Sequence, residues 1–235
     1  SQATRMGRII MGCLYTREEG GLNMFKKLFL SLFAAACFTP FMYADVQGSI
    51  GASSDYFWRG ASQNDGNPAI DLSLEWQGDG FYVGSWASQV DFGDEVQYEY
   101  DFYAGYALLI SDRMAIDVGL IQYNYDEIIE STEEIYAGLS LGQVSLYHYV
   151  NLDNSDLSYS EVEYTFPFVT QLDVSVLYGL HSSEGSVAMG LGDDDYFGMK
   201  LKKDLGDFTI SAMVMDDARH GDIMDNASVS LHYNF

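Results

Sequence analysis

Hydrophobic and polar residues alternate without a break over residues 226–235. The apolar positions are Ala227, Val229, Leu231, Tyr233 and Phe235, and the polar positions are Ser228, Ser230, His232 and Asn234. Successive side chains of a β-strand point to opposite faces, so this period of two predicts a strand with one apolar and one polar face. Taken alone, the segment also fits an ordinary strand at the end of a soluble sheet.

The same alternation, or a short run of β-forming residues, recurs in eleven further segments. They are residues 46–59, 70–77, 81–91, 96–106, 114–124, 135–141, 144–150, 157–166, 172–180, 196–203 and 208–216. Residues 70–77 show the pattern most clearly, because apolar and polar residues alternate at every position. No helical period separates any two segments, so the sequence predicts an all-β protein of about twelve antiparallel strands.

The connections between these segments alternate in length. Residues 78–80, 142–143 and 204–206 form tight Gly-containing turns, whereas the intervening connections are mostly longer, polar and acidic. Short turns at one rim and longer loops at the other are typical of a transmembrane up-and-down β-barrel, and strands of about 9 to 11 residues can cross a bilayer when tilted. Aromatic residues on the apolar faces would form interface girdles, and a soluble sandwich would not keep so many there. An even strand count places both termini of the barrel domain on the short-turn, periplasmic side.

The first 44 residues have the pattern of a targeting segment rather than of the barrel. Met24 opens a short basic stretch, and an apolar run over residues 28–43 ends just before Asp45. We therefore predict a secretory signal peptide at 24–44, a mature barrel at 45–235, and a mis-assigned start or cloning remnant at 1–23.

Both cysteines of the chain, Cys13 and Cys37, precede the expected cleavage point. The mature chain would then contain no cysteine, which excludes a disulfide-stapled scaffold in a compartment where disulfides can form. An alternative makes Cys37 the lipidated residue of a lipoprotein, because three alanines precede it. The usual Leu is missing from the third position before it, and apolar residues continue after it, which disfavours this alternative.

The charge of the chain is strongly acidic, with 11 basic against 35 acidic residues and a net charge of -24. Residues 1–44 carry a net charge of +3, which leaves -27 for residues 45–235. Such a surface repels nucleic acid, so we expect no nucleic-acid partner. Aromatic residues make up 15% of the chain, which argues against a disordered acidic segment.

Three segments carry a resemblance to a known family. Residues 53–70 read SSDYFWRGASQNDGNPAI, residues 84–93 read GSWASQVDFG, and residues 101–106 read DFYAGY. These blocks resemble the TorF-type porin family of bacterial outer-membrane β-barrel proteins. The resemblance covers most of residues 45–235 and is sharpest over residues 50–125. It implies an outer-membrane barrel and supplies no substrate and no catalytic residues.

Strand parity places many charged side chains on the inner wall of the expected barrel. The acidic candidates for pore lining are Asp55, Asp71, Glu75, Glu99, Asp101, Asp117, Glu161, Glu163 and Asp173, and the basic candidates, expected to form a constriction, are Arg59, Lys200 and Lys202. Because few bases face many acids, most of these carboxylates need water, which favours a hydrated lumen over a plugged one. A net acidic wall favours cations and small neutral solutes, so we predict a porin-like channel for passive diffusion.

Two other classes of function remain open at this point. An outer-membrane hydrolase would use His181 near Asp173, or His232 near Ser228 and Ser230, although no motif singles these residues out. A structural or cation-binding barrel without an open pore would use the acidic segments 126–134 and 190–195, although their spacing fits no calcium loop. No cofactor and no bound metal are expected. His148 falls on the apolar face of its strand, without an evident role.

The remaining expectations concern location and partners. The aromatic ending Tyr233 to Phe235 resembles the closing strand of bacterial outer-membrane barrels, where the barrel-insertion machinery reads such a signal. The expected location is the outer membrane of a Gram-negative bacterium. Its lipid and lipopolysaccharide would surround the barrel, and small solutes would occupy the lumen.

Overall fold

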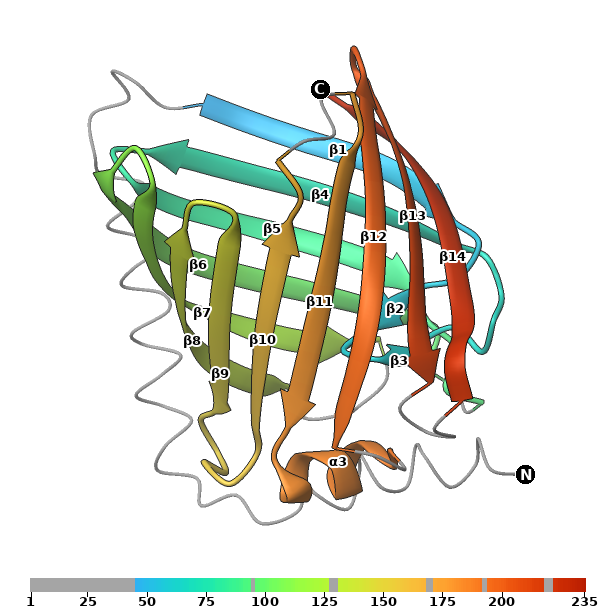
Figure 1. The fold of residues 1–235 in the computed structure, drawn as a ribbon. Coiled ribbons are helices and arrows are strands. Elements are labelled where there is room, and N and C mark those ends of the chain that lie inside the picture. Colours follow the sequence, from blue (N-terminus) through green and yellow to red (C-terminus); the bar gives the residue numbers. More distant parts are fainter. Residues whose placement is uncertain (1–44, 94–95, 127–130, 168–170, 192–193, 218–221) are drawn as a thin grey trace.

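The computed structural model describes residues 45–93, 96–126, 131–167, 171–191, 194–217 and 222–235 (Figure 1). The expected signal peptide at 24–44, the segment 1–23 and the alternative lipidation site Cys37 lie outside the described residues.

Twelve strands of the described chain form a closed barrel, as the sequence predicts (Figure 1). They are β1 (Asp45–Ser53), β4 (Ala69–Gly78), β5 (Phe81–Gln89), β6 (Tyr98–Ser111), β7 (Met114–Tyr125), β8 (Thr132–Leu141), β9 (Val144–Asn151), β10 (Ser158–Thr165), β11 (Asp173–His181), β12 (Asp195–Leu205), β13 (Phe208–Asp217) and β14 (Asp222–Asn234). Each strand pairs antiparallel with its neighbours in chain order, and β14 closes the ring by pairing with β1. The backbone N–H of Gly48 donates to the carbonyl of Phe235, and that of Phe235 donates back to Gly48, each at 2.9 Å.

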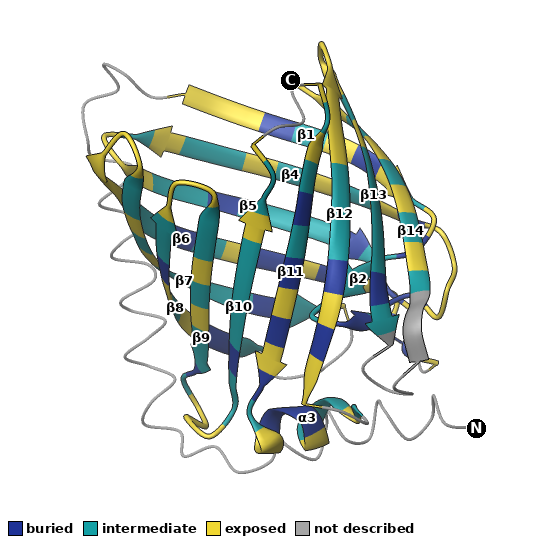
Figure 2. Ribbon diagram, in the orientation of Figure 1, coloured by how far each residue is buried: buried dark blue, intermediate teal, exposed yellow. Residues whose placement is uncertain are grey.

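More exposed and more buried residues alternate along the strands of the barrel (Figure 2). Ile70, Leu72 and Leu74 point outward with exposed fractions of 57%, 50% and 50%, whereas Glu99 and Asp101 point inward and are 3% and 5% exposed. Apolar side chains outside and polar side chains inside reverse the arrangement of a soluble protein. They are what a transmembrane barrel requires, because the bilayer satisfies no polar group.

Short turns gather at one end of the barrel and longer loops at the other. Asp79 and Gly80 have φ angles of 53° and 84°, which are typical of the two-residue hairpin turn that their sequence predicts. The carboxyl end of the chain lies at this short-turn end (Figure 1).

The predicted first strand, residues 46–59, is too long. β1 ends at Ser53, and the chain then leaves the wall and forms a small hairpin of β2 (Phe57–Trp58) and β3 (Ala61–Ser62). Arg59 and Gly60 form its turn with φ angles of 48° and 85°. Positive φ at both central residues belongs to a tight hairpin turn rather than to a strand, and glycine at the second position makes this turn accessible.

The expectation that no helix separates the strands is wrong at one place. α3 (Ser183–Met189) lies between β11 and β12, and the Ser182 side chain caps it by accepting from the N–H of Gly185 at 3.1 Å. Gly190 ends it with a φ of 67°. The described residues contain no helix that is both long and apolar enough to cross a membrane.

Candidate functional site

The β2–β3 hairpin lies inside the ring of strands, toward the end of the barrel that carries α3 (Figure 1). Trp58 packs edge-on against Tyr123 of β7, with ring centroids 5.6 Å apart. On another side of the ring, Ser228 of β14 donates to the carbonyl of Asp55 at 2.6 Å. The hairpin and the residues that lead into it therefore extend across the lumen and contact two different sides of the barrel, β7 and β14.

Side-chain hydrogen bonds within the loop shape this hairpin. Asn64 Nδ2 donates to the carbonyls of Asn67 and Pro68 at 2.9 and 2.8 Å, and Ser62 Oγ donates to Asp55 Oδ1 at 2.8 Å. Asn and Ser side chains compete well with regular ladder bonds in this way. This local bonding explains why Asp55 and Arg59, which we expected on the wall of the first strand, instead lie on the loop.

Arg59, at the tip of the hairpin, forms a bidentate ion pair with Glu134 of β8. The Nη1–Oε1 and Nη2–Oε2 distances are 2.9 and 2.7 Å, and both side chains are only 9% exposed. Tyr123 also donates to Glu134 at 3.1 Å. Burial disfavours a charged guanidinium, and the ion pair with the carboxylate of Glu134 compensates for that cost.

Aromatic rings surround the same guanidinium. The Cζ atom of Arg59 lies 4.4 Å from the ring centroid of Trp58, 4.5 Å from that of Tyr149 and 4.4 Å from that of Tyr159. His181 of β11 approaches the carbonyl of Arg59 through its Nε2 at 3.0 Å. A cation stacked among aromatic rings and paired with a carboxylate is held strongly when it is removed from water.

The hairpin and the wall enclose a cavity of about 480 Å³ inside the barrel, called here the lumen cavity. Of the residues predicted to line a pore, it is bordered by Arg59, Asp101, Glu161 and Lys200. Glu161 accepts from Tyr159 at 2.6 Å and from Tyr196 at 3.3 Å. The structure thus brings two of the three predicted bases and two of the predicted acids to one level of the lumen.

The other predicted acids lie on the inner wall in separate hydrogen-bonded groups. Glu163 accepts from Lys200 at 2.8 Å, Glu75 accepts from Tyr103 at 2.9 Å, Asp117 accepts from Tyr82 at 2.6 Å, Asp71 lies 3.1 Å from Nε2 of His232, and Glu99 accepts from Tyr125 at 3.3 Å. These partners are mostly neutral tyrosines. The carboxylates of the inner wall therefore accept hydrogen bonds from tyrosine hydroxyls as well as from Lys200.

Lys202 and Asp173 do not lie at the lumen cavity. They face each other in the register of β12 and β11 near the short-turn end, where Asp173 is exposed and the Lys202 side chain is 52% exposed. Lys202 lies 3.6 Å from Asp204. Its strand position puts it further from the hairpin than Lys200. The structure therefore does not bring Lys202 together with Arg59 and Lys200, and its part in a constriction stays a prediction.

A row of tyrosines on the inner wall packs on glycines, a contact that the sequence did not predict. Each ring packs on the glycine that faces it on the neighbouring strand, in the pairs Tyr103 with Gly84, Tyr82 with Gly105, Tyr136 with Gly119, and Tyr147 with Gly138. A Cβ at any of these glycines would overlap the ring. The hydroxyls of Tyr82 and Tyr136 are hydrogen-bonded to each other, and Tyr147 donates to Asp117 at 3.3 Å. The glycines thus let bulky side chains lie along the wall.

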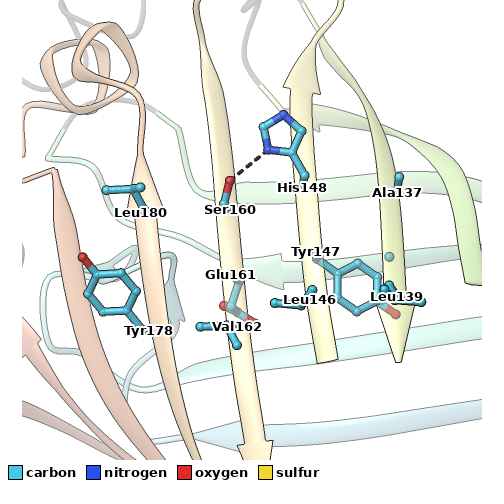
Figure 3. A pocket seen from close by; sticks show the side chains of 11 residues that line it. Ala137, Leu139, Leu146, Tyr147, His148, Ser160, Glu161, Val162, Tyr178 and Leu180 are labelled. Atoms are coloured by element: carbon cyan, nitrogen blue, oxygen red, sulfur yellow. Dashed lines mark hydrogen bonds between the residues drawn. The ribbon is translucent and has the colours of Figure 1, made fainter. Parts of the chain in front are cut away.

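A second hollow lies on the outer face of the barrel, where His148 of β9 and Ser160 of β10 meet (Figure 3). Nδ1 of His148 and Oγ of Ser160 are 2.9 Å apart. Leu146 and Val162 border the same hollow. The hydrogen bond explains how a histidine is tolerated on the lipid-facing side, because each polar group has the other as its partner.

The hydrolase candidates are not brought together. His181 and Asp173 occupy opposite ends of the nine-residue strand β11. His232 is next to Asp71, but Ser228 donates to the Asp55 carbonyl and Ser230 bonds to Ser211 at 2.6 Å. Neither pair forms the nucleophile–base contact that such catalysis needs.

The predicted cation-binding segments are only partly described. Residues 127–130 and 192–193 lie outside the described residues. Glu134, which we assigned to the first of these acidic loops, belongs to β8 and is the partner of Arg59. Within the described ranges, no group of three metal-ligating side chains is close enough together to hold a metal ion.

The chain belongs to the Gcw_chp family, described as a bacterial protein of unknown function, whose profile matches residues 38–221. A comparison with curated proteins finds no significant match.

Among solved structures, the barrel is similar to the KdgM porin in complex with disordered oligogalacturonate. The TM-score is 0.54 at 10% sequence identity, over 81% of this chain and 99% of that chain. It also matches the NanC porin, with a TM-score of 0.43 at 10% identity over 81% and 98%, and an outer membrane channel from Pseudomonas putida F1, with a TM-score of 0.47 at 11% identity over 83% and 98%. At such identities, the likeness to KdgM shows the shared fold alone.

Proposed function

We propose that this protein is an outer-membrane channel for the passive diffusion of small solutes, with a preference for cations. The observation that carries the proposal is the interior of the barrel, where an apolar outer wall encloses a polar lumen that the β2–β3 hairpin narrows at one level. Barrel channels select among ions through the charges of side chains at their narrowest level. The likeness in fold to the KdgM porin and the resemblance to TorF-type porins support the same function.

The preference for cations follows from how charges are matched at the lumen cavity. The two bases that border the cavity are already paired with carboxylates that do not line it: Arg59 with Glu134, and Lys200 with Glu163. Asp101 and Glu161 border the cavity as further carboxylates. The excess of acid attracts cations, admits small neutral solutes and disfavours anions. The KdgM structure contains oligogalacturonate, an acidic sugar; we expect this chain to select a different class of solute.

Location in the outer membrane completes the proposal. The apolar outer face would contact lipid and lipopolysaccharide, and the signal peptide expected at 24–44 would direct export. Tyr233 and Phe235, 41% and 60% exposed on the closing strand, would be read by the barrel-insertion machinery.

A barrel without an open pore is the second candidate, and the ion pair between Arg59 and Glu134 favours it. A hairpin held across the lumen by a buried ion pair would restrict passage. A structural or cation-binding role would then replace transport.

Swelling of proteoliposomes in an isosmotic neutral pentose separates these two functions. We expect vesicles with the wild-type protein to swell, and vesicles with Arg59→Ala to swell faster. Swelling by Arg59→Ala alone would establish a lumen closed by the hairpin. Absence of swelling for both folded proteins would overturn the channel.

A further inference from the structure

Asp101 lies at the centre of a group of aromatic rings on the lumen wall. In the strand register, Asp101 of β6 is directly opposite Trp86 of β5 on one side and Tyr123 of β7 on the other. The hairpin loop covers both rings, with Tyr56 5.0 Å from Trp86 and Trp58 5.6 Å from Tyr123, measured between ring centroids. All five side chains border the lumen cavity and are called here the Asp101 cage.

The carboxylate of Asp101 is buried and incompletely bonded. It is 5% exposed, and its Oδ1 has no hydrogen-bond partner among the described residues. Other wall carboxylates differ, since Asp117 accepts from both Tyr82 and Tyr147. A buried acceptor without a donor raises the free energy of the folded state, and a ligand with an N–H group would remove that cost.

The same cavity already shows what a carboxylate among aromatic rings holds. Arg59 places its guanidinium against Glu134 and within 4.5 Å of the ring centroids of Trp58, Tyr149 and Tyr159. The Asp101 cage has the same ingredients. Both bases that border the cavity, Arg59 and Lys200, are engaged by other carboxylates, Glu134 and Glu163, so the described chain supplies no cation to Asp101.

We propose that the Asp101 cage is a binding subsite for a small organic cation that carries an alkylammonium or guanidinium group. The N–H donor bonds to Oδ1 of Asp101, and the positive charge lies against the faces of Trp86 and Tyr123. A cavity of about 480 Å³ is of the size that small molecules occupy. This inference rests on the proposed channel and names the class of solute that it selects.

Tryptophan fluorescence provides a test that does not depend on transport. Two of the three tryptophans of the chain, Trp58 and Trp86, belong to the cage, so an occupant changes their emission. The refolded protein in detergent micelles is titrated with butylammonium, butanol and butyrate, which share a carbon chain and differ in the head group. We expect a saturable change with butylammonium alone. An equal response to butanol would mean a merely apolar cavity and would overturn the proposal.

A matched pair of variants tests the role of Asp101. Asp101→Asn keeps the shape and removes the charge, and we expect it to weaken butylammonium binding by at least about tenfold, as expected for loss of a hydrogen bond to a charged group. Asp117→Asn removes the same charge from the neighbouring strand, where both oxygens have donors, and we expect a change of less than about twofold. Equal losses of butylammonium affinity in the two variants would mean that the overall negative charge of the lumen attracts the cation, and would contradict the subsite.

The outcomes for binding and for transport are separable. Binding that depends on Asp101 in a barrel that passes no solute would keep the subsite and refute the channel. Solute flux without butylammonium binding would keep the channel and refute the subsite. If Asp101→Asn does not fold, the comparison of the three probes on the wild-type protein decides.

Discussion

Arg59 and Glu134 lie 75 positions apart in the sequence and form a buried bidentate ion pair inside the barrel. Arg59 is at the tip of the hairpin that follows β1, and Glu134 is on β8, which lies far from β1 in either direction around the ring of strands. The pair therefore ties a loop from one side of the barrel to the opposite wall.

Arg59→Ala releases the hairpin and leaves Glu134 buried without its partner. We expect the free energy of unfolding to fall by about 3–5 kcal/mol, as for other broken buried pairs. We also expect larger single-channel conductance, because the hairpin no longer holds its place across the lumen. Denaturant unfolding in micelles and planar-bilayer recordings measure the two effects.

The control for this prediction is Arg113→Ala, which removes the same charge from an exposed turn residue. It should change neither stability nor conductance appreciably. The double variant Arg59→Ala/Glu134→Gln should lose less stability than the sum of the single variants, because the second substitution removes the charge that the first leaves unpaired. Additive losses would show that the two residues act independently.

Lys200 and Lys202 provide a test of where the lumen selects ions. Lys200 borders the lumen cavity, and Lys202 is half exposed near the short-turn end. Lys200→Ala should raise the ratio of cation to anion permeability, because it removes a positive charge at the narrow level. Lys202→Ala, with the same change of charge, should shift the reversal potential less. A larger shift for Lys202→Ala would place the selective level elsewhere.

Gly84→Ala tests the tyrosines that lie along the wall. The new Cβ would overlap the ring of Tyr103, which would have to leave Gly84 and its hydrogen bond to Glu75. We expect a loss of about 1–3 kcal/mol in the free energy of unfolding, typical of overpacking, and a smaller conductance as the ring moves into the lumen. Gly84→Ala/Tyr103→Ser should recover the conductance, and a double variant that stays narrow would contradict this account.

The polar pair on the outer face predicts a stability effect without a change in transport. Ser160→Ala leaves His148 without its partner on the lipid-facing side, which should cost about 0.5–1 kcal/mol in a bilayer. His148→Leu/Ser160→Ala replaces both groups by apolar ones and should restore the stability. Unfolding in lipid vesicles measures both. If the double variant is the least stable of the set, the hydrogen bond between His148 and Ser160 does not offset the cost of placing these polar groups in lipid.

The barrel could be predicted from the sequence because its pattern is local. Residues 70–77 alternate perfectly and form β4, and the pair Asp79–Gly80 forms the expected tight turn. Period-two alternation fixes both the strand and its two faces, so the inward position of Asp101 also followed from the sequence.

The hairpin could not be predicted from the same pattern. Tyr56 and Trp58 keep the parity of Ile50 and Ala52, which made the predicted strand too long, although three polar residues at 53–55 and three aromatic residues at 56–58 interrupt the alternation. In the structure, the Arg59–Gly60 turn and the loop bonds of Asn64 make a hairpin of this segment. Its position in the lumen depends on Glu134, a partner on a distant strand. Gly60 directly after Arg59 was a local signal, because a two-residue turn requires a residue that accepts positive φ.

The positions of the tyrosines also depend on partners in other strands. Tyr103 and Gly84 are paired across β5 and β6, and the contact of the ring with the glycine follows from that register. A glycine facing a tyrosine in the predicted register of adjacent strands would have indicated it. The short helix α3 had its own local signal in the cap Ser182 and the ending Gly190.

The most direct test of the central claim is the reversal potential of single channels in a planar bilayer under a salt gradient. The purified, refolded protein should give discrete conductance steps with a reversal potential on the cation-selective side. An anion-selective reversal potential would contradict the assignment of the acidic lumen as the selective element, and a folded barrel that gives no steps would contradict the channel itself.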